Sequence, residues 1–100
     1  MQSEAVGATL ARGRRNSTKF FKLHYLPNTL GIAAVALVVP KRLAKRAVDR
    51  TRVRRLIRET FRLNQQRWDG YDCVVRLTSA FAADADYIND LNDLWKTPKR

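Results

Sequence analysis

The side chains best suited to chemistry lie between residues 41 and 62, which hold ten lysines and arginines against two acids. Eight of the ten are arginines. A guanidinium presents a planar fork of N–H donors that grips a phosphate bidentately and stacks on a nucleobase. The segment therefore predicts phosphate binding, and we expect the contacting residues to be Lys41, Arg42, Lys45, Arg46, Arg50, Thr51, Arg52, Arg54, Arg55, Arg58 and Arg62.

The same segment predicts a long helix over residues 47–67. At 100° per residue, one arc of the helix is largely apolar and contains Val53, Leu56, Ile57, Thr60 and Phe61. The opposite side is an arginine ridge made of Arg54, Arg55, Arg58 and Arg62. The two acids of the segment cannot neutralise this ridge, and like charges four residues apart weaken a helix by a few tenths of a kcal/mol each, about 0.2–0.5. A polyanion would relieve that repulsion, although a merely solvated basic face is the alternative.

A second candidate surface comes from a predicted strand over residues 19–26. Alternation places Phe20, Lys22 and His24 on one face, and Arg76 of a strand over residues 71–77 can join them. An aromatic ring beside cations is typical of a groove for single-stranded nucleic acid. The alternative for Phe20 is that it packs beneath a helix.

A catalytic set is not evident in the sequence. His24 is the single histidine, so paired-imidazole cleavage of RNA is excluded, and Cys73 lies in an apolar strand typical of the core. Asp86, Asp90 and Asp93 share a helical face that either binds Mg²⁺ or faces solvent, and we favour solvent. We therefore expect no catalytic residue and no metal ligand in the protein.

The remaining pattern predicts one α+β domain over residues 1–100. Residues 1–15 form a short helix (3–11) or a frayed end, and residues 32–39, apolar on both faces, predict a central strand. A last helix runs from an N-cap at Asp84 to about Trp95. These elements predict a two-layer sandwich, a mostly antiparallel sheet with helices on one face.

The overall charge restricts the partners. Twenty lysines and arginines against nine acids give a net charge of +11, which favours nucleic acid before an anionic membrane. The longest apolar run, residues 30–39, is about half of what a membrane helix needs. A DNA-reading helix usually mixes amides and hydroxyls with arginine, whereas this ridge is almost entirely arginine. We expect a cytoplasmic protein that binds RNA, with neither a membrane nor DNA as partner.

Several motifs in order resemble the bacterial ribonuclease P protein subunit, from about Arg12 onward. Pro40-Lys41-Arg42 resembles the family's Ser-Lys-Lys element. The run Arg50-Thr51-Arg52-Val53-Arg54-Arg55 resembles its Arg-Asn-Arg helix motif, and Tyr71–Arg76 resembles its following strand. Thr51 stands where the family usually has Asn, Pro40 replaces a Ser, and no Phe precedes Phe20, although the family's N-terminal helix carries aromatics.

The resemblance implies a fold of the ribosomal protein S5 domain 2 type with a left-handed βαβ crossover. It implies that the arginine helix docks on the catalytic RNA of ribonuclease P. A cleft with Phe20, Lys22, His24 and Arg76 would bind the 5′ leader of precursor tRNA. Mg²⁺ would be held mainly by the RNA, which would cut the leader to leave the mature tRNA 5′ end. The alternative is a structural RNA-binding protein of ribosomal type without a role in cleavage.

Overall fold

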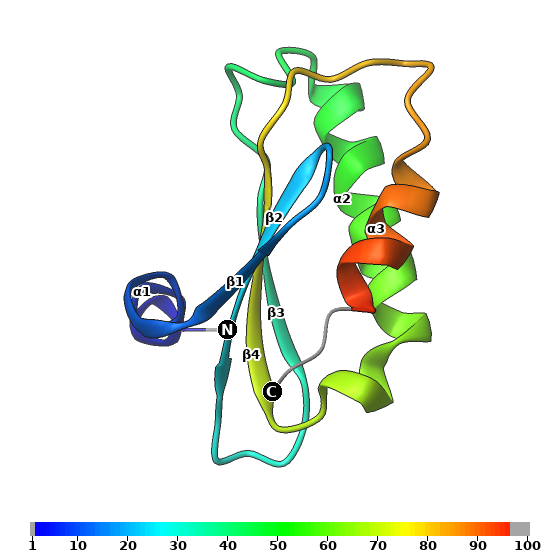
Figure 1. Cartoon of the computed structure of the whole chain (residues 1–100). Coiled ribbons are helices and arrows are strands. Elements are labelled where there is room, and N and C mark those ends of the chain that lie inside the picture. Colours follow the sequence, from blue (N-terminus) through cyan, green and yellow to red (C-terminus); the bar gives the residue numbers. More distant parts are fainter. Residues whose placement is uncertain (1, 97–100) are drawn as a thin grey trace.

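The computed structural model describes residues 2–96, which form one sheet and the helices around it (Figure 1). In chain order the elements are α1 (Ser3–Arg12), β1 (Arg14–Ser17), β2 (Phe21–Pro27), β3 (Ala34–Val38), α2 (Ala47–Leu63), the 3₁₀ helix η1 (Gln65–Trp68), β4 (Tyr71–Leu77) and α3 (Tyr87–Trp95). None of the helices in residues 2–96 combines the length and apolarity needed to cross a membrane.

The sheet has the order β1-β2-β4-β3. Strand β2 pairs antiparallel with both β1 and β4, whereas β3 pairs parallel with β4. The prediction that the apolar strand is central is therefore wrong, because β3 lies at an edge of the sheet. Val35 and Leu37 pack against the core, while every residue of β3 stays half-buried. An apolar composition on both faces did not distinguish this edge from a central position.

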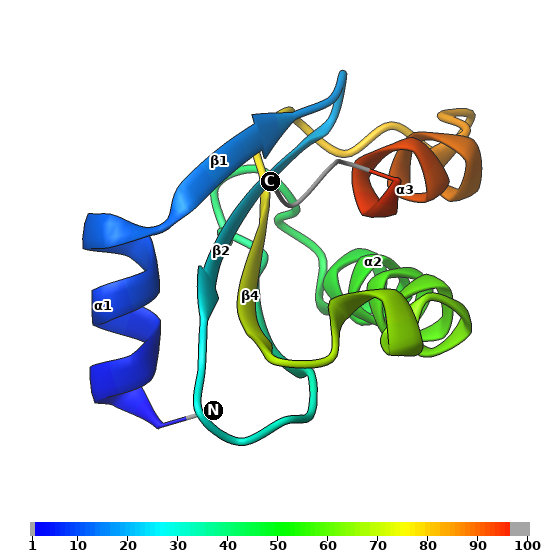
Figure 2. The same cartoon turned by 60° about the horizontal axis from the view of Figure 1, so that its bottom comes forward.

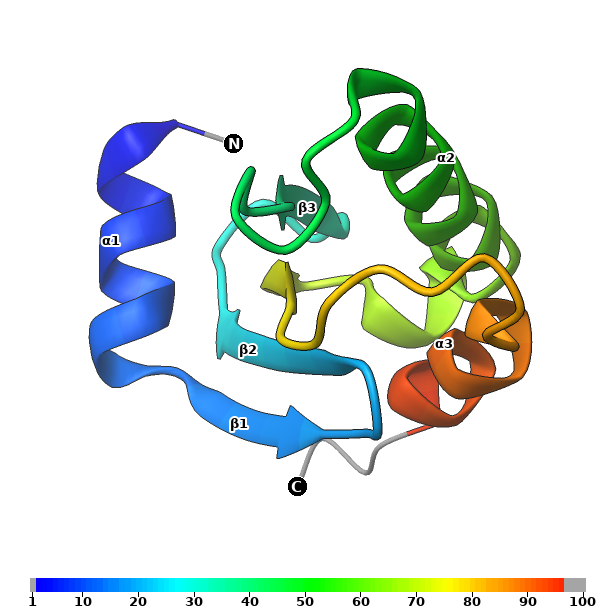
Figure 3. The ribbon, with the colours of Figure 1, turned by 90° about the horizontal axis from the view of Figure 1, so that it is seen from above.

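The connection from β3 through α2 to β4 joins two adjacent parallel strands. Seen from above, the chain leaves β3, passes along α2 and returns to β4 in the left-handed sense (Figure 3). Most such crossovers are right-handed. The α+β architecture and the crossover that the resemblance implies are thus present.

The core lies between the sheet and the layer formed by α2 and α3 (Figure 2). Alternate residues of strands β2 and β4 point into this core from the sheet face that α2 and α3 cover, and they are buried. The helices supply the opposite wall, and Trp95 Nε1 donates to Thr60 Oγ1 over 3.0 Å inside it. The fully buried side chains of this core include Phe21, Leu23, Val53, Ile57, Trp68, Cys73, Val75, Leu77, Leu91, Leu94 and Trp95.

Helix α1 lies on the opposite face of the sheet from α2 and α3 (Figures 1 and 2). The expectation of helices on one face therefore holds for α2 and α3 but not for α1. Thr9 of α1 is fully buried against the sheet. At Gly13, which ends the helix, a Cβ would lie 2.4 Å from the Thr9 carbonyl oxygen and 2.8 Å from that of Tyr25. Only glycine allows the chain to turn from α1 into β1 so close to β2.

Several element boundaries differ from the prediction, and three of these differences bear on the arrangement of the elements. Strand β1 was not predicted, because its four residues are all polar and only pairing with β2 makes them a strand. Helix α2 stops at Leu63, and η1 continues the segment to Trp68. The N-cap of α3 is Asp86 rather than Asp84, and its side chain accepts a hydrogen bond from the Asn89 N–H over 3.2 Å.

Candidate nucleic-acid interface

The arginine ridge of α2 is exposed. Val53, Ile57, Thr60 and Phe61 are buried against the core, as the apolar arc predicts. No ion pair within residues 2–96 involves any of the solvent-facing arginines of α2. The exposed side chains of the helix that the sequence assigned to RNA are Thr51, Arg52, Arg54, Arg55, Arg58 and Arg62. Their charges are therefore available to an external anion.

A groove of about 670 Å³ separates this helix from the edge strand β3. Because β3 has a paired neighbour on only one side, its outer edge leaves peptide groups free for other partners. One wall is therefore peptide backbone with small apolar side chains, and the other carries guanidinium groups. The lining residues are Val35, Ala36, Leu37, Thr51, Arg54, Arg55, Arg58 and Glu59. Such a groove suits a phosphate-sugar chain better than a small apolar ligand.

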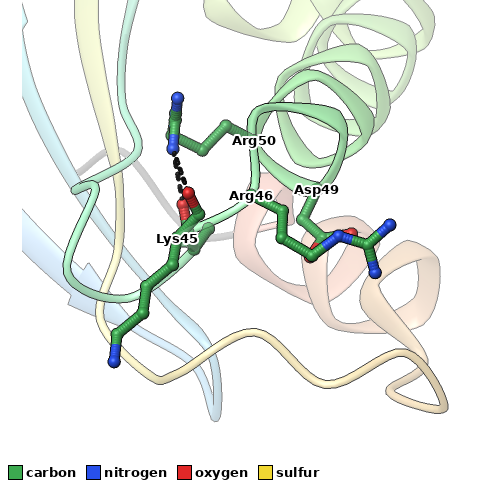
Figure 4. Close-up of polar contacts among 5 residues, drawn as sticks. Lys45, Arg46, Asp49 and Arg50 are labelled. Atoms are coloured by element: carbon green, nitrogen blue, oxygen red, sulfur yellow. Dashed lines mark hydrogen bonds and ion pairs between the residues drawn. The ribbon is translucent and has the colours of Figure 1, made fainter.

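The loop before α2 presents further cations, and Arg50 holds this loop in place (Figure 4). Lys41, Arg42, Lys45 and Arg46 are exposed. Arg50 differs, because its Nη1 donates to the carbonyl oxygens of Ala44 and Lys45, each over 2.9 Å. The sequence assigned Arg50 to RNA, but in the structure this guanidinium is half-buried and bonded to the chain itself.

We expect Arg50→Ala to lower the free energy of unfolding by about 1 kcal/mol, because two carbonyls lose a charged donor. Hydrogen exchange should become faster in the loop of residues 40–46. The matched variant Arg52→Ala, which removes an exposed arginine on the same helix, should change stability by less than about 0.5 kcal/mol. Equal stability of the two variants in urea denaturation would contradict the positioning role.

A second basic surface lies on the α1 side of the sheet. The register aligns Arg15, His24, Val74 and Ala36 in one row across the four strands. The next row on the same face contains Ser17, Lys22, Arg76 and Val38. We call Arg15, Lys22, His24 and Arg76 the sheet-face cluster. Arg15 was missed because β1 was not predicted, and only the pairing of β1 with β2 places it opposite His24.

Phe20 does not belong to the sheet-face cluster, so the prediction that it shares a face with Lys22 and His24 is wrong. Its ring lies 5.0 Å from that of Tyr87 in α3, on the opposite side of the sheet. Its backbone N–H donates to Asp90 Oδ2 over 3.1 Å. Phe20 precedes β2, so strand alternation does not apply to it. The alternative, that it packs beneath a helix, is confirmed.

His24 is the buried member of the sheet-face cluster, with 6% of its surface exposed. Burial lowers its pKa, and the charges of Lys22, Arg15 and Arg76 lower it further. His24 is therefore neutral at pH 7. Because its pKa is lower in the folded than in the unfolded chain, its contribution to stability decreases as the pH falls through 6.5 toward the folded pKa.

The three aspartates considered as magnesium ligands do not gather into one group in residues 2–96. No group of three His, Cys, Asp or Glu side chains in residues 2–96 is placed to hold a metal ion. Of the three aspartates considered for that role, Asp90 accepts hydrogen bonds from Thr18 Oγ1, Lys19 N and Phe20 N. Asp90 thus fastens α3 to the β1–β2 turn and is not simply solvated.

The fold and the two surfaces define a small α+β protein with cations clustered in the groove between α2 and β3 and on the α1 side of its sheet. The chain belongs to the ribonuclease P protein family, because the family model described as Ribonuclease P matches residues 3–99. It is 43% identical to the ribonuclease P protein component of Chromobacterium violaceum over 81 residues, covering 81% of this chain and 67% of that protein. The protein from Halorhodospira halophila is 34% identical over 94 residues, covering 92% and 77%.

Two solved structures support the same fold. The Staphylococcus aureus RNase P protein superposes with a TM-score of 0.84 at 19% identity, over 96% of this chain and 90% of that one. The Thermotoga maritima protein gives 0.78 at 21% identity, over 91% and 88%. The chain spans 55% of the Nitrosococcus oceani relative and 58% of the Idiomarina loihiensis relative.

Proposed function

We propose that this protein is the protein subunit of a ribonuclease P, which assists an RNA catalyst in removing the 5′ leader of precursor tRNA. The observation that carries this proposal is that one sheet bears two cationic surfaces, the arginine groove at the β3 edge and the sheet-face cluster on the α1 side. Ala36 of β3 lines the arginine groove and also ends the row that contains His24 and Arg15. Adjacent strands lie about 4.8 Å apart, so one row spans roughly 15 Å. Two RNA segments can therefore lie side by side around the β3 edge.

The two surfaces divide the proposed binding. The exposed arginines of α2 and the basic loop before it bind the catalytic RNA through phosphates, since salt-dependent phosphate contacts need charge rather than base-reading amides. The sheet-face cluster binds the single-stranded leader. Phe20 takes no part in this binding because its ring is packed on Tyr87.

The protein supplies binding and position rather than chemistry. Its cations offset the repulsion between two RNAs and hold the scissile phosphate in register. In this proposal the Mg²⁺ ions that cleavage requires are held mainly by RNA phosphates. We place the protein in the cytoplasm, with no membrane or DNA as partner.

A cleavage assay on precursor tRNA at low Mg²⁺ tests this function. We expect catalytic RNA with the protein to cut the leader faster than catalytic RNA alone, and the protein alone to cut nothing. A ribosomal-type RNA-binding protein without a role in cleavage would bind RNA but leave the rate unchanged.

The leader surface is tested by the double variant Lys22→Gln/Arg76→Gln. Because these side chains face the α1 side of the sheet, we expect affinity for precursor tRNA to fall by about tenfold and affinity for mature tRNA to change less than twofold. The matched variant Lys19→Gln/Lys96→Gln removes the same charge from the α3 side. Equal losses of affinity for precursor and mature tRNA would show that the leader does not bind at the sheet-face cluster.

A further inference from the structure

His24 combines burial with an unused nitrogen. Its Nδ1 is buried and has no hydrogen-bond partner within the described residues. Buried polar atoms in folded proteins nearly always have a partner, so an orphaned one marks a place where a ligand, an ion or a proton is expected. His24 lies in the middle of the sheet-face cluster, between Arg15 of β1 and Val74 of β4.

The groups that face His24 are cationic on every strand around it. Arg15 comes from β1, Lys22 from β2 itself and Arg76 from β4, and each of these charges acts on the imidazole. Asp72 of β4 is an acid on that face, and its Oδ1 accepts a hydrogen bond from Asn28 Nδ2 over 3.0 Å. Glu4 and Arg12 of α1, the helix packed on this face, are exposed. Within residues 2–96, a positive charge on His24 thus has repulsive neighbours and no carboxylate hydrogen-bonded to it.

We propose that His24 takes up one proton when an RNA phosphate binds among Arg15, Lys22 and Arg76, so that leader binding is coupled to protonation. The inference rests on the proposed leader surface. A phosphodiester anion offsets part of the charge of the three cations, which weakens their opposition to the imidazolium form, while the burial of the ring still opposes it. The proton comes from solvent, and the phosphodiester stays ionised. The charged ring then has a second N–H donor, and its Nδ1 gains a negatively charged environment.

Proton coupling has a direct consequence for affinity. Each unit by which a ligand raises a pKa corresponds to a tenfold change in affinity across the pH range between the two pKa values. We expect a single-stranded RNA to bind several-fold, and less than tenfold, more tightly at pH 5.5 than at pH 7.5, at constant ionic strength. His24 is the single histidine of the chain, so it is the group that gives this dependence.

The experiment uses the full-length protein and a five-nucleotide single-stranded RNA. His24 is the single histidine of the chain, so its ring protons titrate in the NMR spectrum without ambiguity. We expect the His24 pKa to lie below 6.5 in the free protein and to rise by about one unit at saturating RNA. Inorganic phosphate in place of RNA tests whether the phosphate group alone is sufficient.

The variant His24→Gln keeps a hydrogen-bonding side chain that cannot titrate. We expect its RNA affinity to lose the difference between pH 5.5 and 7.5, while the protein stays folded by circular dichroism. The proposal is overturned if the His24 pKa of the unaltered protein is the same with and without saturating RNA. If instead Lys22→Gln/Arg76→Gln binds the RNA normally, the leader surface itself is wrong. If that double variant weakens RNA binding as expected but RNA leaves the His24 pKa unchanged, the leader surface is correct and only the proton coupling is wrong.

Discussion

Replacing Arg54 and Arg58 by glutamine is expected to weaken binding of the protein to the catalytic RNA by about ten- to a hundredfold at 0.15 M salt. Both arginines are exposed, line the groove beside β3 and have no ion pair within residues 2–96. Each lost phosphate contact removes about one released counterion, so the slope of log affinity against log salt should become shallower by about two. Titrations at several salt concentrations measure both effects.

The control for this variant removes equal charge elsewhere. Lys19→Gln/Lys96→Gln lowers the net charge by the same amount, but both lysines lie on the α3 side of the molecule. We expect its salt slope to match that of the unaltered protein. A shallower salt slope in both double variants would indicate general electrostatic attraction. An unchanged salt slope in Arg54→Gln/Arg58→Gln would show that the arginine groove does not contact the RNA.

Replacing Asp90 by alanine is expected to lower the free energy of unfolding by about 2–3 kcal/mol. Its carboxylate accepts from Thr18 Oγ1 over 2.6 Å, from Lys19 N over 3.2 Å and from Phe20 N over 3.1 Å. These bonds join α3 to residues more than sixty positions earlier in the chain. Without the carboxylate, two peptide N–H groups in the turn before β2 lose their partner.

Urea denaturation of Asp90→Ala and the control Asp93→Ala measures this effect. Asp93 is exposed and its ion pair with Lys96 at 3.8 Å is also exposed, so its loss should change stability by less than about 0.5 kcal/mol. Because Asp90 lies far from the arginine groove, the folded variant should keep its affinity for the catalytic RNA. Equal stability of the two variants would show that the turn does not depend on α3.

Periodicity within one element was reliable evidence. The apolar arc of α2 predicted which residues are buried, including Val53 and Ile57, and which arginines face solvent. Alternation in β2 and β4 predicted that Leu23 and Val75 enter the core while Lys22 and Arg76 do not. These assignments depend on local geometry, in which the spacing of residues determines the face they occupy.

Neighbours across the sheet could not be predicted in this way. The four polar residues of β1 form a strand only because β2 is there to pair with them, so Arg15 was missed. Phe20 has the spacing of the His24 face, but Asp90 and Tyr87 hold the turn before β2 on the other side. Arg50 is chemically suited to bind phosphate, yet its guanidinium donates hydrogen bonds to the carbonyl oxygens of its own loop.

The sequence by itself determined the α+β class, the amphipathic arginine helix and the excess of charge that needs an anionic partner, because composition and spacing act within single elements. The tertiary structure alone decided that β3 is an edge strand, that α1 covers the far face, and that His24 lies among three cations with no partner for its Nδ1 in residues 2–96. Those features follow from strand pairing and from the crossover in which α2 connects β3 to β4. Both bring together residues that are distant along the chain.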